Sequence, residues 1–210
     1  SAHVRLENIT LKGVDGGGGS KIRPYAPSDN AVIELVNFNR PDGCDDGDDA
    51  CGFYVPGSHA GVLRFINCHV EGFSNNGIYA SSPGKEANGP VEVYGGLYKN
   101  NDVAGVRLGS VGSKAISVAV VNDAHGPGIS GGNAQRGIPI REPGPVEVRD
   151  CDITQLDEPG VSGPIMVENH IFYSNRDGAL RVENTRIRND TGVAAVNLGE
   201  SGYDASGDNI

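Results

Sequence analysis

The chain has 210 residues, enough for one domain or one uninterrupted array of repeats, and it lacks the apolar run of roughly 20 residues that a transmembrane helix needs. Its 27 acidic and 17 basic residues give a formal net charge of -10, which disfavours nucleic acid as a partner because phosphates would repel such a surface. The 32 glycines are spread along the chain and therefore predict many turns.

One short phrase recurs along the chain about every 29 residues, which indicates a repeat architecture. The seven copies are VRLENITL (4–11), VIELVNF (32–38), LRFINCHV (63–70), VEVYGGL (91–97), ISVAVVN (116–122), VEVRDCDI (146–153) and LRVENTRI (180–187). Each copy reads as a strand, a corner and a second strand. The predicted corner residues are Asn8, Leu35, Asn67, Gly95, Val120, Asp150 and Asn184.

Apolar residues alternate within each copy, which is typical of strands that bury one face. With a third strand after each polar bend, the pattern predicts an all-β solenoid of about seven coils, spanning residues 1–210 as a single domain. Stacked amides should form a ladder along the axis, with Asn8, Asn67 and Asn184 as members and Asp150 as a variant. A β-sandwich and a propeller are the competing architectures. We expect the chain to be a fragment or a processed product.

The four cysteines separate into two pairs by context. Cys44 and Cys51 bracket an acidic loop, and we predict that they form a disulfide, which would imply an oxidising compartment. Cys68 and Cys151 occupy equivalent positions three coils apart. At about 4.8 Å per coil they are roughly 14 Å apart, too far for a disulfide, so we predict two buried free thiols.

These repeats resemble the right-handed parallel β-helix of pectate lyases, polygalacturonases and many extracellular solenoid proteins. The resemblance covers the chain from Val4 to about Gly202 and implies an extracellular or cell-surface location. The acidic, lysine-poor composition, with 27 acidic residues, suits a halophilic source, although an ordinary acidic secreted protein fits equally well.

Polar bends precede the third strand of each coil, and together they predict one face on which charged, polar and aromatic side chains gather. Carboxylates, a histidine, a cation and aromatic rings on that face are what saccharide recognition and cleavage require. We predict catalytic roles for Asp49, Asp102, His125 and Arg107, and substrate binding by Tyr54, Tyr79, Asn76 and Asp157. Ser130, Ser162 and Asn197 are predicted to continue the outward column. The simpler alternative is that these are ordinary turn residues and that the two tyrosines stack on each other.

Three motifs also resemble those of polygalacturonases in their order along the chain: GDDAC (47–51), AHGPGIS (124–130) and RIRN (186–189). Two coils are expected to lie between the acidic pair and His125. The acidic loop additionally suggests a calcium site, with Asp45, Asp46 and Asp48 as ligands, because Ca²⁺ prefers several oxygen ligands from one turn. A solvated acidic loop is the alternative.

Two functional classes follow. One is a surface, adhesive or filament-forming solenoid that binds carbohydrate or associates end to end. The other is a lyase or glycoside hydrolase that acts on acidic polysaccharide along the third-strand face, with Asp49 and Asp102 as the carboxylate pair. His125 would then tune the acid or bind substrate, and in a lyase Arg107 would be the base.

Overall fold

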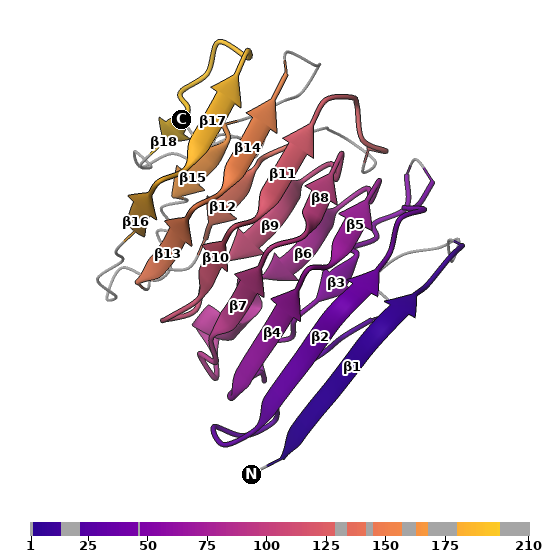
Figure 1. Cartoon of the computed structure of the whole chain (residues 1–210), viewed down its shortest axis with the longest axis vertical. Helices are drawn as coiled ribbons and strands as arrows, with labels where there is room; N and C mark the ends of the chain where they lie inside the picture. The colour runs from indigo at the N-terminus through magenta and orange to yellow at the C-terminus, as the bar shows by residue number, and fades with distance from the viewer. Residues whose placement is uncertain are drawn as a thin grey trace.

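The computed structural model describes residues 2–13, 22–45, 47–128, 134–141, 145–156, 163–167 and 180–197. They form an all-β parallel solenoid of about six turns, in which successive coils stack along one axis (Figure 1). The predicted fold class is confirmed, and the predicted seven coils exceed the observed number by one. No helix among the described residues is long and apolar enough to cross a membrane.

Three parallel sheets run along the solenoid (Figure 1). Sheet A orders β1 (His3–Thr10), β2 (Val32–Asn39), β4 (Val62–Ile66), β7 (Val91–Tyr94), β10 (Lys114–Ile116), β13 (Val146–Arg149) and β16 (Leu180–Glu183). Sheet B orders β5 (His69–Glu71), β8 (Leu97–Lys99), β11 (Ala119–Asn122), β14 (Asp152–Gln155) and β17 (Arg186–Asn189). Sheet C orders β3 (Phe53–Tyr54), β6 (Asn76–Ala80), β9 (Ala104–Leu108), β12 (Ile138–Ile140), β15 (Ile165–Val167) and β18 (Val196–Asn197). One 3₁₀ turn, η1, spans Ser82–Lys85.

The corner between sheets A and B is made by a residue in the left-handed conformation. The predicted corners at Asn8, Asn67, Gly95, Asp150 and Asn184 all have positive φ. The predictions of Leu35 and Val120 are wrong: the chain turns instead at Asn37, with φ 47°, and at Ser117, with φ 56°. A branched or bulky side chain is strongly disfavoured at positive φ, whereas a small polar residue tolerates it.

An amide ladder links the first two corners, but it joins the predicted member Asn8 to Asn37, which the prediction did not include. Asn37 donates its side-chain N–H to the Asn8 side-chain oxygen at 2.9 Å, and Asn39 donates to Asn37 at 2.9 Å. At the fourth corner the ladder gives way to Gly95. A Cβ there would lie 2.2 Å from the side-chain oxygen of Asn67, so the Asn67 amide occupies the space above the glycine.

The core is a set of columns along the axis, each made of residues in register. One column on sheet A runs from Leu6 through Leu35, Phe65, Val93 and Ala115 to Val148 and Val182. An aromatic cluster links the sheets across the interior, because Phe53 lies 5.5 Å from Phe38 and 5.1 Å from Phe65 between ring centroids. The prediction that Cys68 and Cys151 are buried free thiols is confirmed.

Tyr98 is fully buried within this core, and its hydroxyl has no hydrogen-bond partner among the described residues. Such a group bears the cost of desolvation without compensation, typically about 1–3 kcal/mol. We therefore expect Tyr98→Phe to raise the free energy of unfolding by about 1 kcal/mol, measured by urea titration. The matched control is Tyr94→Phe, which removes a hydroxyl that donates to Glu92 and should not stabilise the protein. A destabilised Tyr98→Phe variant would contradict the assignment.

His59 is a second fully buried polar residue, and both ring nitrogens are engaged. Its Nδ1 accepts from the Ala26 N–H at 2.9 Å, and its Nε2 lies 3.1 Å from the Pro90 carbonyl oxygen. A carbonyl only accepts, so the proton resides on Nε2 and the ring is neutral. Burial lowers the pKa of His59, and the hydrogen bond to Pro90 opposes this only in part.

This geometry predicts a loss of stability in mild acid. The lowered pKa means that the unfolded chain binds a proton below pH about 6.5 while the folded His59 does not. The stabilisation is therefore complete above that pH and declines as the pH falls through the folded pKa. We expect the urea midpoint to drop between pH 7.5 and 5.0, and to drop less in His59→Gln. Parallel pH curves for the wild type and His59→Gln would contradict the prediction.

Candidate functional site

The predicted outward column of sheet C is correct at its first three positions and at Asn197. Tyr54, Tyr79 and Arg107 are in register on β3, β6 and β9. Ser130 and Ser162 lie outside the described residues, and the third strands of those coils are β12 and β15 instead. Pro139, Met166 and Asn197 are in register along β12, β15 and β18 and continue the column. The sequence alone missed this shift because the loops before β12 and β15 vary in length.

The two tyrosines stack on each other, as the simpler reading anticipated. Their ring centroids are 5.3 Å apart, the Arg107 guanidinium lies 4.8 Å from the Tyr79 centroid, and that of Arg23 lies 5.4 Å from the Tyr54 centroid. The two ring planes are tilted by 44°, and each ring contacts the other tyrosine and one cation. A sugar could stack on either face only by displacing a neighbour.

Three of the predicted residues surround the buried Cys51 thiol. Burial raises the pKa of Cys51 to about 11; Asp49 raises it further, whereas Asn76 and Arg107 oppose the shift. Asn76 and Arg107 are themselves buried, and exposed Asp49 accepts from the Asn75 side chain at 2.5 Å. The structure therefore brings Asp49, Asn76 and Arg107 together, around a thiol that stays protonated near neutral pH.

The disulfide prediction is wrong, because Cys44 and Cys51 are both free in this structure. The Cys44 thiol donates to the Ser74 hydroxyl at 3.1 Å and accepts from the Ser74 N–H at 3.0 Å. Cys44 thus packs on the following coil, while Cys51 faces Asn76. Each thiol is engaged with the next coil rather than with the other cysteine.

The acidic loop meets the loop that contains His125, although two coils separate their strands. Gly47 donates its N–H to the Gly128 carbonyl oxygen at 2.8 Å. The 123–128 loop also packs against the preceding coil at Asn100. A Cβ at Gly126 would be 2.6 Å from the Asn100 carbonyl oxygen. Two coils do lie between the acidic pair and His125, as expected, but the loops on either side fold over these coils and meet.

The four predicted catalytic residues differ sharply in exposure. Asp49 and His125 are exposed, whereas Asp102 and Arg107 are 0 and 4 % exposed. A carboxylate oxygen of Asp102 accepts from the Ala134 N–H at 3.3 Å, which anchors the chain leading to β12. Asp102 is therefore placed to hold a loop rather than to meet a substrate from solvent.

Two of the predicted ligands lie outside the described residues: Asp157 of the substrate set and Asp46 of the calcium set. Asp45 is exposed, and Asp48 donates its N–H to the Asp45 carbonyl oxygen at 3.3 Å in a tight turn. Within the described part of the chain, no group of three or more His, Cys, Asp or Glu side chains is placed to hold a metal ion. The calcium site stays a prediction.

A row of alternating charges crosses the outer face of sheet A, one residue per strand. Its members, all in register, are Arg5, Glu34, Arg64, Glu92, Lys114, Glu147 and Arg181. We call this row the charge ladder. Arg64 bridges two acids, with 3.2 Å to Glu34 and 2.8 Å to Glu92, and Lys114 lies 3.0 Å from Glu92. Burial opposes ionisation of Glu34, but hydrogen bonds from His3, Arg64 and Arg5 outweigh it and lower its pKa.

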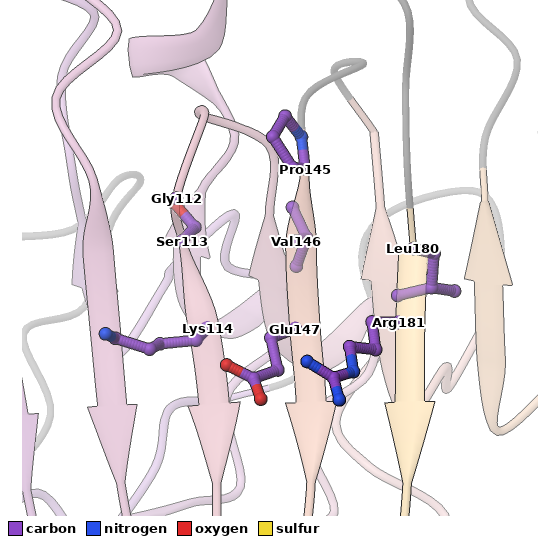
Figure 2. Close-up of a pocket in the computed structure, with 8 residues that line it drawn as sticks. All are labelled: Gly112, Ser113, Lys114, Pro145, Val146, Glu147, Leu180 and Arg181. Carbon is purple, nitrogen blue, oxygen red and sulfur yellow. The ribbon is translucent and has the colours of Figure 1, made fainter.

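A hollow of about 390 Å³ lies at the β16 end of the ladder, and Figure 2 shows Lys114, Glu147 and Arg181 side by side on neighbouring strands. Its lining residues are Gly112, Ser113, Lys114, Pro145, Val146, Glu147, Leu180 and Arg181. This hollow is on sheet A, away from the predicted sheet C face. Part of the ladder was visible in the sequence, because the second letters of the neighbouring copies LRFI and VEVY, and of VEVR and LRVE, are opposite in charge.

Comparison with protein-family models, with curated proteins and with solved structures finds no match to this chain.

Proposed function

We propose that this chain is a structural solenoid of the surface, adhesive or filament-forming type, which associates with a second copy through the apolar side chains exposed at the ends of its described coils. The observation that carries the proposal is the exposure of the core columns at both ends. Leu6 is 43 % exposed although Leu35, next in its column, is 2 % exposed. At the other end of the same column, Val182 is 37 % exposed and Val148 is 0 % exposed.

Within the described residues, both ends combine exposed apolar side chains with an edge strand of sheet A. β1 is an edge strand of eight residues paired with β2 on one side only, as far as the described residues go. Its end also exposes Val4 and Leu11, at 45 and 41 %. An edge strand of this length, with unpaired N–H and C=O groups, is a template for another strand, and proteins normally cover such edges. Association buries the apolar columns and completes the hydrogen bonding.

The test is the state of association in solution. Full burial of a leucine stabilises by about 1.5–3 kcal/mol, and Leu6 has nearly half of its surface left to bury, so Leu6→Ser should weaken association about tenfold. Sedimentation velocity over a concentration series measures this. Val111→Ser is the matched control, because Val111 is 40 % exposed but lies in a lateral turn. A wild type that stays monomeric at all concentrations, or equal effects of both variants, would refute the proposal.

Cleavage of acidic polysaccharide is a second candidate, supported by the contact between Gly47 and Gly128. That contact brings the loops of Asp49 and His125 together on one side of the solenoid. The test is release of reducing ends or unsaturated products from acidic polysaccharides, compared among wild type, Asp49→Ala and, as a control, Asp29→Ala at another exposed site. Equal turnover in all three proteins would exclude Asp49 from catalysis.

A further inference from the structure

The edge strand β1 carries the triplet Arg5, Leu6 and Glu7, whose outer residues form an ion pair at 2.7 Å. Leu6 belongs to the core column, so Arg5 and Glu7 lie on the outward face of sheet A. We infer how the two copies meet, and this inference rests on the self-association proposed above. The second copy pairs its own β1 antiparallel to this one, around a two-fold axis that passes through Leu6.

The charge ladder argues against the head-to-tail alternative. Stacking β16 of one copy on β1 of the next, in the register of sheet A, places Arg181 against Arg5 and Glu183 against Glu7. Like charges directly opposite each other on neighbouring strands are destabilising. The ladder has alternating signs and seven members, so its two ends carry the same sign.

The antiparallel arrangement reverses this relation. When Leu6 faces Leu6 of the second copy, Arg5 faces Glu7 of the second copy, and Glu7 faces its Arg5. A two-fold axis normal to sheet A reverses the strand direction but keeps the inward face inward, so both leucines stay on the core side. The two copies gain two complementary charge pairs and a closed apolar contact at the centre.

The opposite end has the same order of residues, with Val182 between Arg181 and Glu183, which pair at 2.5 Å. It is therefore also matched to an antiparallel copy of itself. β1 runs through the corner at Asn8, whereas the equivalent corner at Asn184 separates β16 from β17, so the sheet A edges at the two ends are similar in length. Head-to-head pairing through β1 and tail-to-tail pairing through β16 are therefore both expected as the concentration rises.

Cysteine cross-linking distinguishes the two polarities. Opposite residues in an antiparallel pair have Cα atoms about 4.5–5.5 Å apart, within the range of a disulfide. Under mild oxidation, Leu6→Cys should therefore give a covalent dimer, whereas Val111→Cys, with comparable exposure, should give only the background amount. The native cysteines are buried and should not contribute. The inference fails if Leu6→Cys gives no more dimer than Val111→Cys.

The double variant Leu6→Cys/Val182→Cys separates failure of this inference from failure of the proposed function. Under head-to-tail stacking it forms bonds between positions 6 and 182 and gives long covalent chains, while Leu6→Cys alone gives no dimer. That pattern would overturn the two-fold arrangement but leave self-association standing. No concentration-dependent association in the wild type would overturn both.

A charge variant gives an independent test, because the two arrangements predict changes of opposite sign in the dissociation constant. Arg5→Gln removes both complementary pairs of the two-fold dimer, each worth about 0.2–1 kcal/mol, so the dissociation constant should rise about 2- to 30-fold. Under head-to-tail stacking the same change relieves the repulsion from Arg181, and the dissociation constant should fall. Glu34 retains His3 and Arg64 as partners, so the fold should persist, and circular dichroism checks this. A lowered dissociation constant would contradict the inference.

Discussion

Gly43→Ala is expected to lower the free energy of unfolding by about 2–5 kcal/mol, from a backbone cost of about 1–2 and a packing cost of about 1–3 kcal/mol. Gly43 has φ +65°, a region that alanine adopts only with strain. A Cβ there would also lie 2.0 Å from the Gly72 carbonyl oxygen on the next coil. That oxygen accepts from the Cys44 N–H at 2.8 Å, so the two coils cannot separate without losing a hydrogen bond.

Gly47→Ala is the matched control because Gly47 lies in the same loop with φ +83° and has nothing within 4 Å of its Cβ position. Gly47→Ala has only the cost of placing alanine at positive φ and should lower the free energy of unfolding by about 1–2 kcal/mol. Urea titration of both variants measures the difference, which isolates the close approach of the two coils. Equal effects would mean that the coils are farther apart at Gly43 than the structure indicates.

Phe53→Ala should destabilise by about 3–5 kcal/mol, the usual cost of emptying a buried phenylalanine site. Phe53 is fully buried and touches Phe38 and Phe65, which lie on neighbouring strands of sheet A. Its loss therefore opens a cavity between the sheets where the first coils stack. Phe53→Leu keeps most of the volume and should be clearly milder.

The location of the damage is as informative as its size. In a solenoid each coil contacts only its neighbours, so a local cavity weakens nearby coils most. Hydrogen exchange of Phe53→Ala should accelerate in β1 to β6 and remain near the wild-type rate in β13 and β14. Uniform acceleration along the whole solenoid would show that the protein unfolds as one cooperative unit.

The fold was predictable because each copy of the repeat has the same apolar alternation and corner position, which fixes how neighbouring strands align. Alternating apolar residues around Asn67 and Asn184 place the strands and the corner, since asparagine tolerates the left-handed conformation that the turn requires. The shifted corners at Asn37 and Ser117 have the same cause. The alignment there followed the apolar pattern, while the chain follows the residue that accepts positive φ.

The candidate site was less predictable, because loops rather than strands decide it. The column of Tyr54, Tyr79 and Arg107 follows from register and was found. The contact between Gly47 and Gly128 joins segments two coils apart, and no periodicity encodes the path of either loop. The burial of Asp102 was likewise hidden, because an aspartate before a bend is usually solvated.

The four buried thiols can report which coil of the solenoid opens, because a thiol reagent reaches each of them only when its coil opens. Cys44 and Cys51 belong to the coil of β2 and β3, Cys68 lies just before β5, and Cys151 lies just before β14. Burial raises the pKa values of Cys51 and Cys68 to about 11, so these thiols resist alkylation until their coil is breached. The order in which a thiol reagent labels them in native buffer will therefore show whether the solenoid frays from one end or opens in the middle.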